Sequence, residues 1–197
     1  MKTTVKFLKV LPVVAVLGLT ACGGDGGDDS DTQGGTGSIV DCFTVNKTVN
    51  FAVLSSALPA NAIPPTRSTT GLMTYNGQAV TGQTFFYPNG NTTYTDSTYW
   101  TTTNNGATLV AEVDYDGAVT IDGTFFPQNM NPGQGAIDSS NNISTFVGFE
   151  TISLASKIFS NTCHFKAGKT DAWFAPGYGI IKRIADDGGI IQYNGNL

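Results

Sequence analysis

Short turn-forming pairs at close intervals constrain the fold of this chain more than any other feature of its sequence. In the middle of the chain an Asn or Asp stands directly before a Gly at five places: Asn76-Gly77, Asn89-Gly90, Asn105-Gly106, Asp116-Gly117 and Asp122-Gly123. Such pairs accept the positive φ angles of tight hairpin turns, and the runs between them are rich in Thr, Tyr, Phe and Val, which favour strands. The pattern therefore predicts a mainly β protein built as an antiparallel meander.

The fourth of these turns also predicts a strand register. A two-residue loop would pair Asp114 with Val119 and so mix polar with apolar side chains. A three-residue loop over residues 115–117, with Gly117 at positive φ, instead places Val113 opposite Val119. We expect the three-residue loop because it keeps apolar residues together.

The same hairpin contains two closely spaced acidic residues that form a candidate site. Glu112 and Asp114 are two positions apart, so they share one face of a strand. Two carboxylates in this arrangement could act as a general acid and base or as metal ligands. We expect them instead on the solvent side of the strand, where acidic residues keep a sheet soluble.

The ends of the domain show weaker patterns. Residues 39–55 are expected to form one or two strands, and residues 57–66 a proline-broken connection. Near the other end, Pro176-Gly177 and residues 186–189 are expected to form turns, with a last strand over residues 190–193.

Residues 1–22 have the features of an export signal with a lipid attachment site. Three lysines precede an apolar run over residues 10–21, which is shorter than the roughly 20 residues of a membrane-spanning helix. The run ends in Leu19-Thr20-Ala21-Cys22, which resembles the lipobox of bacterial lipoproteins. The resemblance implies cleavage before Cys22, diacylglycerol on its thiol and acylation of the new amino terminus with a fatty acid such as palmitate. The alternative is an ordinary cleaved signal followed by an incidental cysteine.

The segment after this cysteine is expected to be a flexible tether. Residues 23–38 are low-complexity Gly, Asp and Ser, with an estimated root-mean-square reach of about 20 to 25 Å. Residue 23 is Gly, whereas an Asp at this place tends to retain such lipoproteins in the inner membrane. The resemblance therefore favours the outer membrane, facing the periplasm. We divide the chain into a signal peptide (1–21), a lipidated cysteine with its tether (22–38) and a β-rich periplasmic domain (39–197).

Two further cysteines, Cys42 and Cys163, are expected to form a disulfide. Cys22 is assigned to the lipid, and an exported domain in an oxidising compartment rarely keeps two unpaired thiols, which remain the alternative. The bond would close a loop of well over 100 residues and stabilise the fold by about 4 to 5 kcal/mol. With Cys163 directed inward, the neighbouring His164 would point outward.

Charge and composition exclude several classes of function. Without the three leader lysines, seven basic residues face fifteen acidic ones, a formal charge of −8, so we expect no binding to nucleic acid. The single histidine cannot form a His-rich zinc site, and neither a Gly-x-Ser-x-Gly nor a Ser-x-x-Lys motif occurs. We therefore expect no enzymatic activity, no metal and no cofactor.

The last third of the chain resembles a known group of envelope proteins. Residues 147–152 (VGFETI), 159–163 (FSNTC) and 172–183 (AWFAPGYGIIKR) are similar to the closing segment of TapB-like envelope lipoproteins. Relatives often have a glycine where this chain has Ser156, just before a Lys-x-Phe turn. The resemblance implies a single antiparallel, strongly curved sheet or half-barrel meander, related in style to the lipoprotein carriers LolA and LolB. It implies no reaction, because most members have no assigned activity.

Three functions follow as hypotheses. The first is an envelope lipoprotein without catalytic activity, anchored in the membrane by lipid and acting as a structural component or binding a partner protein. The second is a carrier or sensor of an apolar small molecule in the concave face, with residues 127–142 as its lid and the pairs Phe85-Phe86 and Phe125-Phe126 as lining. The third is a surface adhesin or glycan binder that uses the Thr-, Asn- and Tyr-rich residues 94–105.

Overall fold

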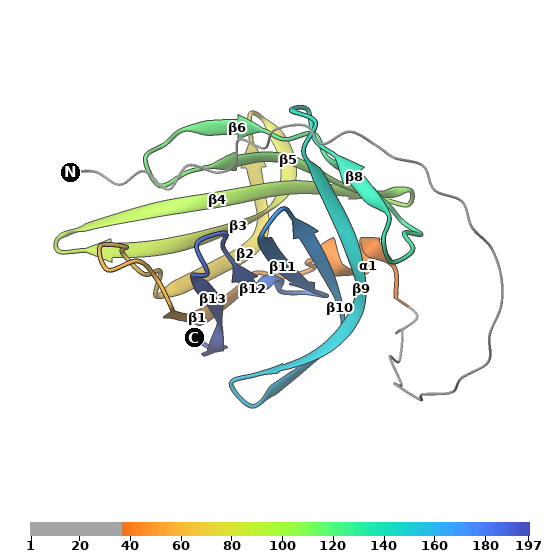
Figure 1. Cartoon of the computed structure of the whole chain (residues 1–197). Coiled ribbons are helices and arrows are strands. Elements are labelled where there is room, and N and C mark those ends of the chain that lie inside the picture. The colour runs from red at the N-terminus through yellow and green to blue at the C-terminus, as the bar shows by residue number, and fades with distance from the viewer. Residues whose placement is uncertain (1–36) are drawn as a thin grey trace. The chain divides into compact units, whose positions relative to one another are not determined.

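The computed structural model describes residues 37–197, and these residues form one short helix and one antiparallel sheet of thirteen strands (Figure 1). The protein is therefore mainly β, as its turn pattern predicts. The elements in chain order are α1 (Ile39–Phe43), β1 (Val49–Ser56), β2 (Arg67–Tyr75), β3 (Gln78–Asn89), β4 (Thr92–Thr103), β5 (Gly106–Val113), β6 (Val119–Ile121), β7 (Phe125–Pro127), β8 (Gly135–Ile137), β9 (Ile143–Leu154), β10 (Lys157–Ala167), β11 (Thr170–Ala175), β12 (Gly179–Ile184) and β13 (Ile190–Asn196).

The strand order shows two meanders joined side by side. Strands β6 to β1 lie next to one another in reverse chain order, and β13 to β8 continue the sheet in the same way. The first and last strands, β1 and β13, therefore pair in the middle of the sheet. Strands β6 and β8 form its two outer edges, and the sheet is not closed into a barrel.

The sheet curves strongly enough for distant strands to face each other. Four strands separate β4 from β12 in the sheet, yet Arg183 Nη2 on β12 lies 3.7 Å from Asp96 Oδ2 on β4. The helix α1 contacts β4 and β5 as well as β10 and β11. The concave face therefore wraps around α1, and it carries the core.

Phe43 of α1 is the centre of this core. Its buried ring lies with its centroid 4.5 to 6.1 Å from the rings of Trp100, Phe126, Phe165 and Phe174, which come from four different strands. Trp100 Nε1 donates a hydrogen bond to the Phe43 carbonyl oxygen at 2.6 Å. Each buried aromatic side chain stabilises the fold by about 1.5 to 3 kcal/mol. The protein's own aromatic side chains thus occupy the concave face.

The predicted three-residue hairpin loop is confirmed. Val113 pairs with Val119, and Gly117 has a φ of 84°. The loop is closed by two backbone hydrogen bonds of Asp114: its N–H donates to the Ala118 carbonyl at 2.9 Å, and its carbonyl accepts from the Gly117 N–H at 2.8 Å. The expected turns at Pro176-Gly177 and at residues 186–189 are present as well, between β11 and β12 and between β12 and β13.

The start of the domain differs from the prediction, because its first element is a helix and not a strand. The Ser38 hydroxyl caps this helix by accepting a hydrogen bond from the Val40 N–H at 3.2 Å. At the carboxyl end of the helix, the Thr44 hydroxyl donates a hydrogen bond to the Val40 carbonyl oxygen at 2.7 Å. These caps, and the burial of Ile39 and Phe43, stabilise a five-residue helix that has no sequence period of its own.

The pair Asp122-Gly123 does not form a hairpin. Strands β6 and β7, on either side of it, both pair with β5, so residues 119–127 are one interrupted strand. Gly123, with a φ of 73°, kinks the chain while its N–H still donates to the Leu109 carbonyl at 2.9 Å. The expected turn is therefore a kink within one edge of the sheet.

Residues 127–142, which the sequence suggests as a lid, are not a loop throughout. They contain β8, which pairs with β9 and forms an outer strand of the sheet. Met130 and Ala136 from this segment are buried in the core. A segment that contributes to both the sheet and the core is poorly suited to move as a lid.

Candidate functional site

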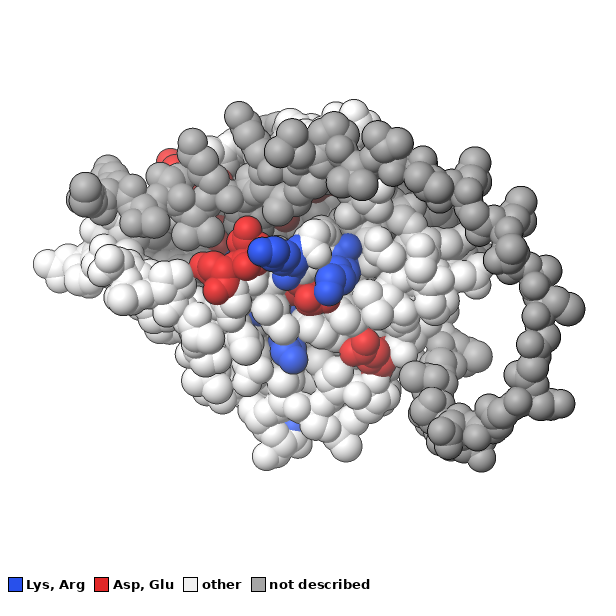
Figure 2. All heavy atoms as spheres, viewed as in Figure 1, with Lys and Arg blue, Asp and Glu red and all other residues white. Residues whose placement is uncertain are grey.

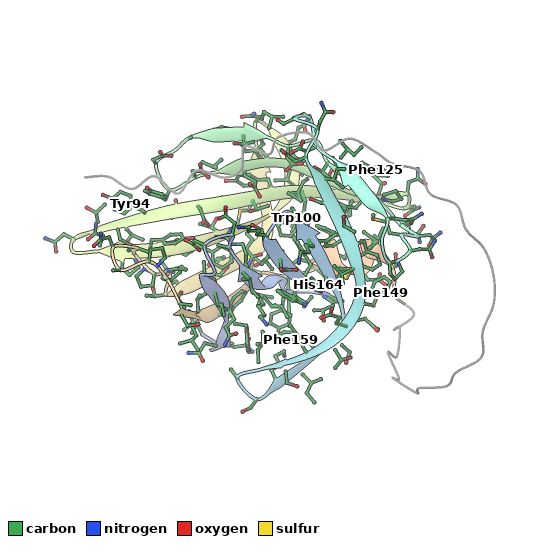
Figure 3. The ribbon with its side chains drawn as sticks, in the orientation of Figure 1. Tyr94, Trp100, Phe125, Phe149, Phe159 and His164 are labelled. Carbon is green, nitrogen blue, oxygen red and sulfur yellow. A yellow bond between two sulfur atoms is a disulfide. The ribbon has the colours of Figure 1, made fainter. Side chains whose placement is uncertain are left out.

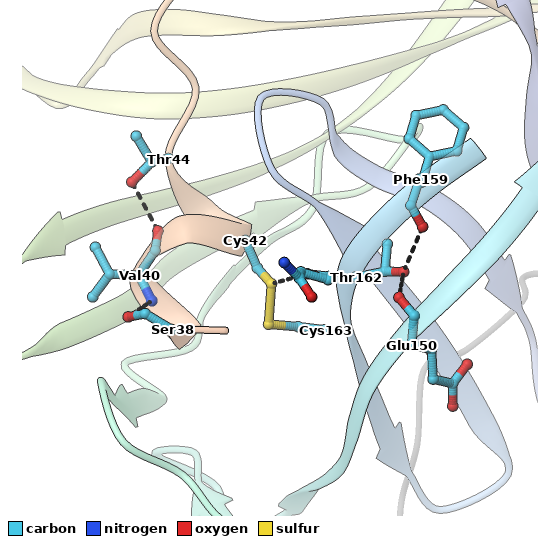
Figure 4. The surroundings of a disulfide bond; sticks show 9 residues. Ser38, Val40, Cys42, Thr44, Glu150, Phe159, Thr162 and Cys163 are labelled. Atoms are coloured by element: carbon cyan, nitrogen blue, oxygen red, sulfur yellow. Dashed lines mark hydrogen bonds between the residues drawn. A yellow bond between two sulfur atoms is a disulfide. The ribbon is translucent and has the colours of Figure 1, made fainter. Parts of the chain in front are cut away.

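The disulfide between Cys42 and Cys163 is present, as the sequence predicts. The two sulfur atoms lie 2.12 Å apart, both residues are fully buried, and 121 positions separate them in the chain (Figure 4). The bond joins α1 to β10, and so fixes the helix against the concave face. On β10, the Thr162 hydroxyl donates to the Glu150 carbonyl of the neighbouring strand at 2.5 Å.

The expected lipidation site, Cys22, and the expected signal peptide lie outside the described residues. Within residues 37–197, no helix is both long enough and apolar enough to cross a membrane.

A group of polar side chains on the concave face is the first candidate site. Tyr87 on β3, Asp96 on β4, Glu112 on β5 and Arg183 on β12 form what we call the inner polar cluster. The Tyr87 hydroxyl donates a hydrogen bond to the Asp96 carboxylate, which also lies 3.7 Å from the Arg183 guanidinium. Burial raises the pKa of Asp96 above its ordinary value, and it also raises the pKa of Tyr87.

Glu112 belongs to this cluster, so its expected place on the solvent side is wrong. Burial raises the pKa of its carboxyl from an ordinary value of 4.5 to about 7. The Arg183 guanidinium opposes the rise, and the carboxylates of Asp122, Asp96 and Asp114 add to it. Burial likewise raises the pKa of Asp114, which shares this face of β5.

The cluster combines one guanidinium with more than one carboxyl group. One Arg can neutralise one carboxylate, so a second carboxyl in the same partly buried place favours its protonated form. A Glu that titrates near neutral pH could exchange a proton with a bound molecule, which is the property of a general acid or base.

A second polar group lies on the opposite face of β9, β10 and β11. His164 Nδ1 is 2.7 Å from Glu150 Oε1, and His164 Nε2 is 2.8 Å from Asp171 Oδ1. The imidazole stacks on Trp173 with 4.1 Å between ring centroids, and Trp173 Nε1 donates to Glu150 Oε2 at 2.8 Å. We call Glu150, His164, Asp171 and Trp173 the outer histidine group.

Two lysines extend this group. Lys182 Nζ lies 4.6 Å from the centroid of the Trp173 ring, and Lys166 Nζ lies 3.9 Å from Asp171. In Figure 2, side chains of both charges gather near the centre of the face drawn, in the part of the view where Figure 3 labels His164. The group is thus a network of alternating charges around a stacked ring pair.

The outer histidine group is better suited to structure than to catalysis. Cys163 points inward and His164 lies on the other face, as the strand alternation predicts. Both imidazole nitrogens lie within hydrogen-bond distance of carboxylate oxygens, Nδ1 beside Glu150 and Nε2 beside Asp171. These two contacts and the stacking on Trp173 hold the ring in one orientation. Trp173 is itself buried by this packing.

The aromatic pairs of the carrier hypothesis do not line one surface. Phe85 and Phe126 are buried, whereas their neighbours Phe86 and Phe125 lie on the other face of their strands. Phe86 stacks under the Arg67 guanidinium at 3.9 Å, and Phe125 is exposed. Since the inner aromatic rings pack against one another, the structure gives this hypothesis little support.

Sequence reasoning missed most residues of both polar groups. Tyr87, Asp96 and Arg183 lie on three strands that are distant in the sequence, and no spacing connects them. Their rarity could have indicated them. Charged residues make up only 13% of the chain, and a charged side chain that is buried within a strand needs a partner.

No known protein family, no curated protein and no solved structure matches this chain. The resemblance of its last third to TapB-like lipoproteins therefore stays a prediction. Among the described residues, no three or more His, Cys, Asp or Glu side chains are arranged so that they could hold a metal ion.

Proposed function

We propose that this chain is an envelope lipoprotein without catalytic activity, which is held in the membrane through Cys22 and presents its β-domain to a partner protein in the periplasm. The observation that carries the proposal is the order of features in the leader: lysines, a short apolar run, then Leu19-Thr20-Ala21-Cys22. Two or three acyl chains, at about 0.8 kcal/mol for each buried methylene group, would anchor the protein stably.

The disulfide supports an address outside the cytoplasm. Reducing conditions in the cytoplasm keep thiols reduced, whereas the periplasm favours their oxidation to disulfides. The bond between Cys42 and Cys163 spans 121 positions and lies in the centre of the core. A domain built around this cross-link is suited to an exported protein.

The polar side chains of the described domain are mostly engaged with one another. Carboxylate oxygens lie within hydrogen-bond distance of both nitrogens of His164, and Glu112 lies within the curved sheet beside Arg183.

The proposed location in the outer membrane depends on Gly23, which follows the proposed lipidation site. Binding of a partner protein is likewise a proposal.

Replacement of the anchor residue tests this function. We expect the Cys22→Ser protein to lose its acyl chains and to be either unprocessed or released from membranes. The measurement is fractionation of cells followed by immunoblotting of membrane and soluble fractions. A Ser30→Ala protein, changed in the expected tether, is the control and should stay in the membrane fraction. Normal processing and membrane retention of the Cys22→Ser protein would contradict the proposal.

A further inference from the structure

Exposed apolar side chains gather on the strands at the two edges of the sheet. The exposed fractions are 54% for Val119, 59% for Ile121, 44% for Phe125, 58% for Ile137 and 55% for Ile143. These residues belong to β6, β7, β8 and the first position of β9. We call this set the apolar seam.

The two edges of the sheet meet at this set. Ser139, in the turn between β8 and β9, donates its backbone N–H to the Asp122 carbonyl at 3.0 Å. Its hydroxyl donates to the Ile121 carbonyl at 2.9 Å. Ile137 and Ile143 are direct partners across β8 and β9. The end of β6 therefore lies beside the β8–β9 turn (Figure 1), and the apolar residues of both edges form one surface.

The apolar seam faces away from the core. Neighbours of its residues along each strand, Phe126 on β7 and Ala136 on β8, are buried in the core, as is Phe146 on β9. Because side chains alternate between faces, Phe125, Ile137 and Ile143 point outward. The protein leaves these side chains uncovered although its concave face has a filled aromatic core.

The charges around the seam favour an apolar and not an ionic contact. The sequence contains no Lys or Arg between Arg67 and Lys157, a stretch that includes every residue of the seam. The nearby Asp138 carboxylate accepts hydrogen bonds from the backbone N–H groups of Ser140 and Asn142. The seam residues themselves carry no cation with which to attract anionic lipid headgroups, so their contact with a lipid surface depends on buried apolar area.

The chain enters the domain next to the same strands. The Ile39 N–H donates to the carbonyl of Gln128, which directly follows β7, at 3.2 Å. Gly37 packs on the ring of Phe149 on β9, so that a Cβ there would lie 2.7 Å from the ring. The Gly-rich tether that the sequence predicts would reach about 20 Å from this point. The tether would hold the edge that carries Phe125 and Ile143 close to any membrane in which Cys22 is anchored.

We infer that the apolar seam rests on the lipid surface to which Cys22 is attached, so that the domain lies against the membrane by this edge. The inference depends on the proposed function, because it needs the lipid anchor. It adds an orientation, in which the long β3–β4 hairpin stays available to a partner.

A lipid-phase quencher tests the contact in the full-length protein. An Ile143→Cys variant has one free thiol, since Cys22 is acylated and the other two cysteines are bonded to each other. The thiol receives an environment-sensitive fluorophore, and the protein is inserted through its anchor into phosphatidylcholine vesicles that contain doxyl-labelled phosphatidylcholine. The matched control is Ile158→Cys, because Ile158 is 66% exposed and lies at the far end of the β9–β10 hairpin.

We expect the label at position 143 to be quenched severalfold more than the label at position 158. Equal quenching at both positions would overturn the inference. So would a label at 143 that lipid does not quench, together with a disulfide between two copies of the unlabelled Ile143→Cys protein, because the seam would then be a protein interface. Flotation of the protein with the vesicles reports the anchor separately. Floating protein with equal quenching refutes the orientation alone, whereas protein that does not float refutes the proposed function and the orientation together.

Discussion

The Glu112→Gln substitution is expected to change how stability depends on pH. Burial raises the pKa of Glu112 from 4.5 to about 7, which means that the folded state prefers the protonated side chain. For a carboxyl with a raised pKa, the stabilising contribution of the proton is complete below pH 4.5 and is lost as the pH rises through about 7. Glutamine is neutral at every pH and has nearly the same shape, so the variant should not lose this stability.

The size of the effect follows from the shift. Each unit of pKa difference between the folded and unfolded states corresponds to 1.36 kcal/mol, so the rise to about 7 corresponds to about 3 kcal/mol. At pH 4 the two proteins should have similar free energies of unfolding. At pH 8 the Glu112→Gln protein should be more stable than the original by about 3 kcal/mol, because the original holds an ionised Glu112 in a partly buried place beside Asp96 and Asp122.

Urea unfolding at several pH values measures this difference. Tryptophan fluorescence reports the transition, since Trp100 and Trp173 are both buried in the folded domain. An Asp186→Asn protein is the control, because Asp186 is an exposed carboxylate in the turn between β12 and β13, and its stability should follow that of the original protein. If plots of unfolding free energy against pH stay parallel for the Glu112→Gln and original proteins from pH 4 to pH 8, the account of the inner polar cluster is wrong.

Three further changes probe the core and one turn by urea unfolding. Replacing Cys42 and Cys163 together by Ala should lower the free energy of unfolding by about 5 kcal/mol, since the loop spans 121 positions; a loss below about 1 kcal/mol would contradict this. Trp100→Phe removes the hydrogen bond to the Phe43 carbonyl and should cost about 1 to 3 kcal/mol, and a neutral result would argue against that bond. Ser156→Gly should stabilise by about 1 kcal/mol, because Ser156 has a φ of 65°, and destabilisation would refute the strain.

The turn residues predict much of the fold because their effect is local. The Asp116-Gly117 pair needs positive φ, and its flanking apolar residues then set the register of Val113 opposite Val119. The place of Ser156 illustrates the same rule. It stands in the β9–β10 turn at positive φ, where a glycine is easily accommodated.

The burial of Glu112 could not be predicted, because a β-bulge reverses the faces of β5. Trp100 pairs with Leu109 and Tyr99 pairs with Ala111, so Val110 is an extra residue in β5. One extra residue moves all later side chains to the opposite face. The apolar alternation of the hairpin therefore describes its outer side, and the acidic positions point into the concave face.

The tertiary partners of α1 and of the inner polar cluster were equally hidden from the sequence. Five residues are too few for a helical period, and α1 is stable because Phe43 packs against four strands. Arg183 and Asp96 meet because the sheet curves, and no local pattern of residues encodes the curvature between β12 and β4. The disulfide was predictable because it follows from the number of cysteines and from the export that the leader sequence predicts.

Mass spectrometry of the amino-terminal peptide, from protein purified out of the cell envelope, tests the central claim most directly. We predict a mature chain that begins at Cys22 and carries the mass of a diacylglycerol group together with an acyl chain. A mature chain that begins at any other residue, or a Cys22 without added mass, would contradict the assignment of this protein as a lipid-anchored component of the envelope.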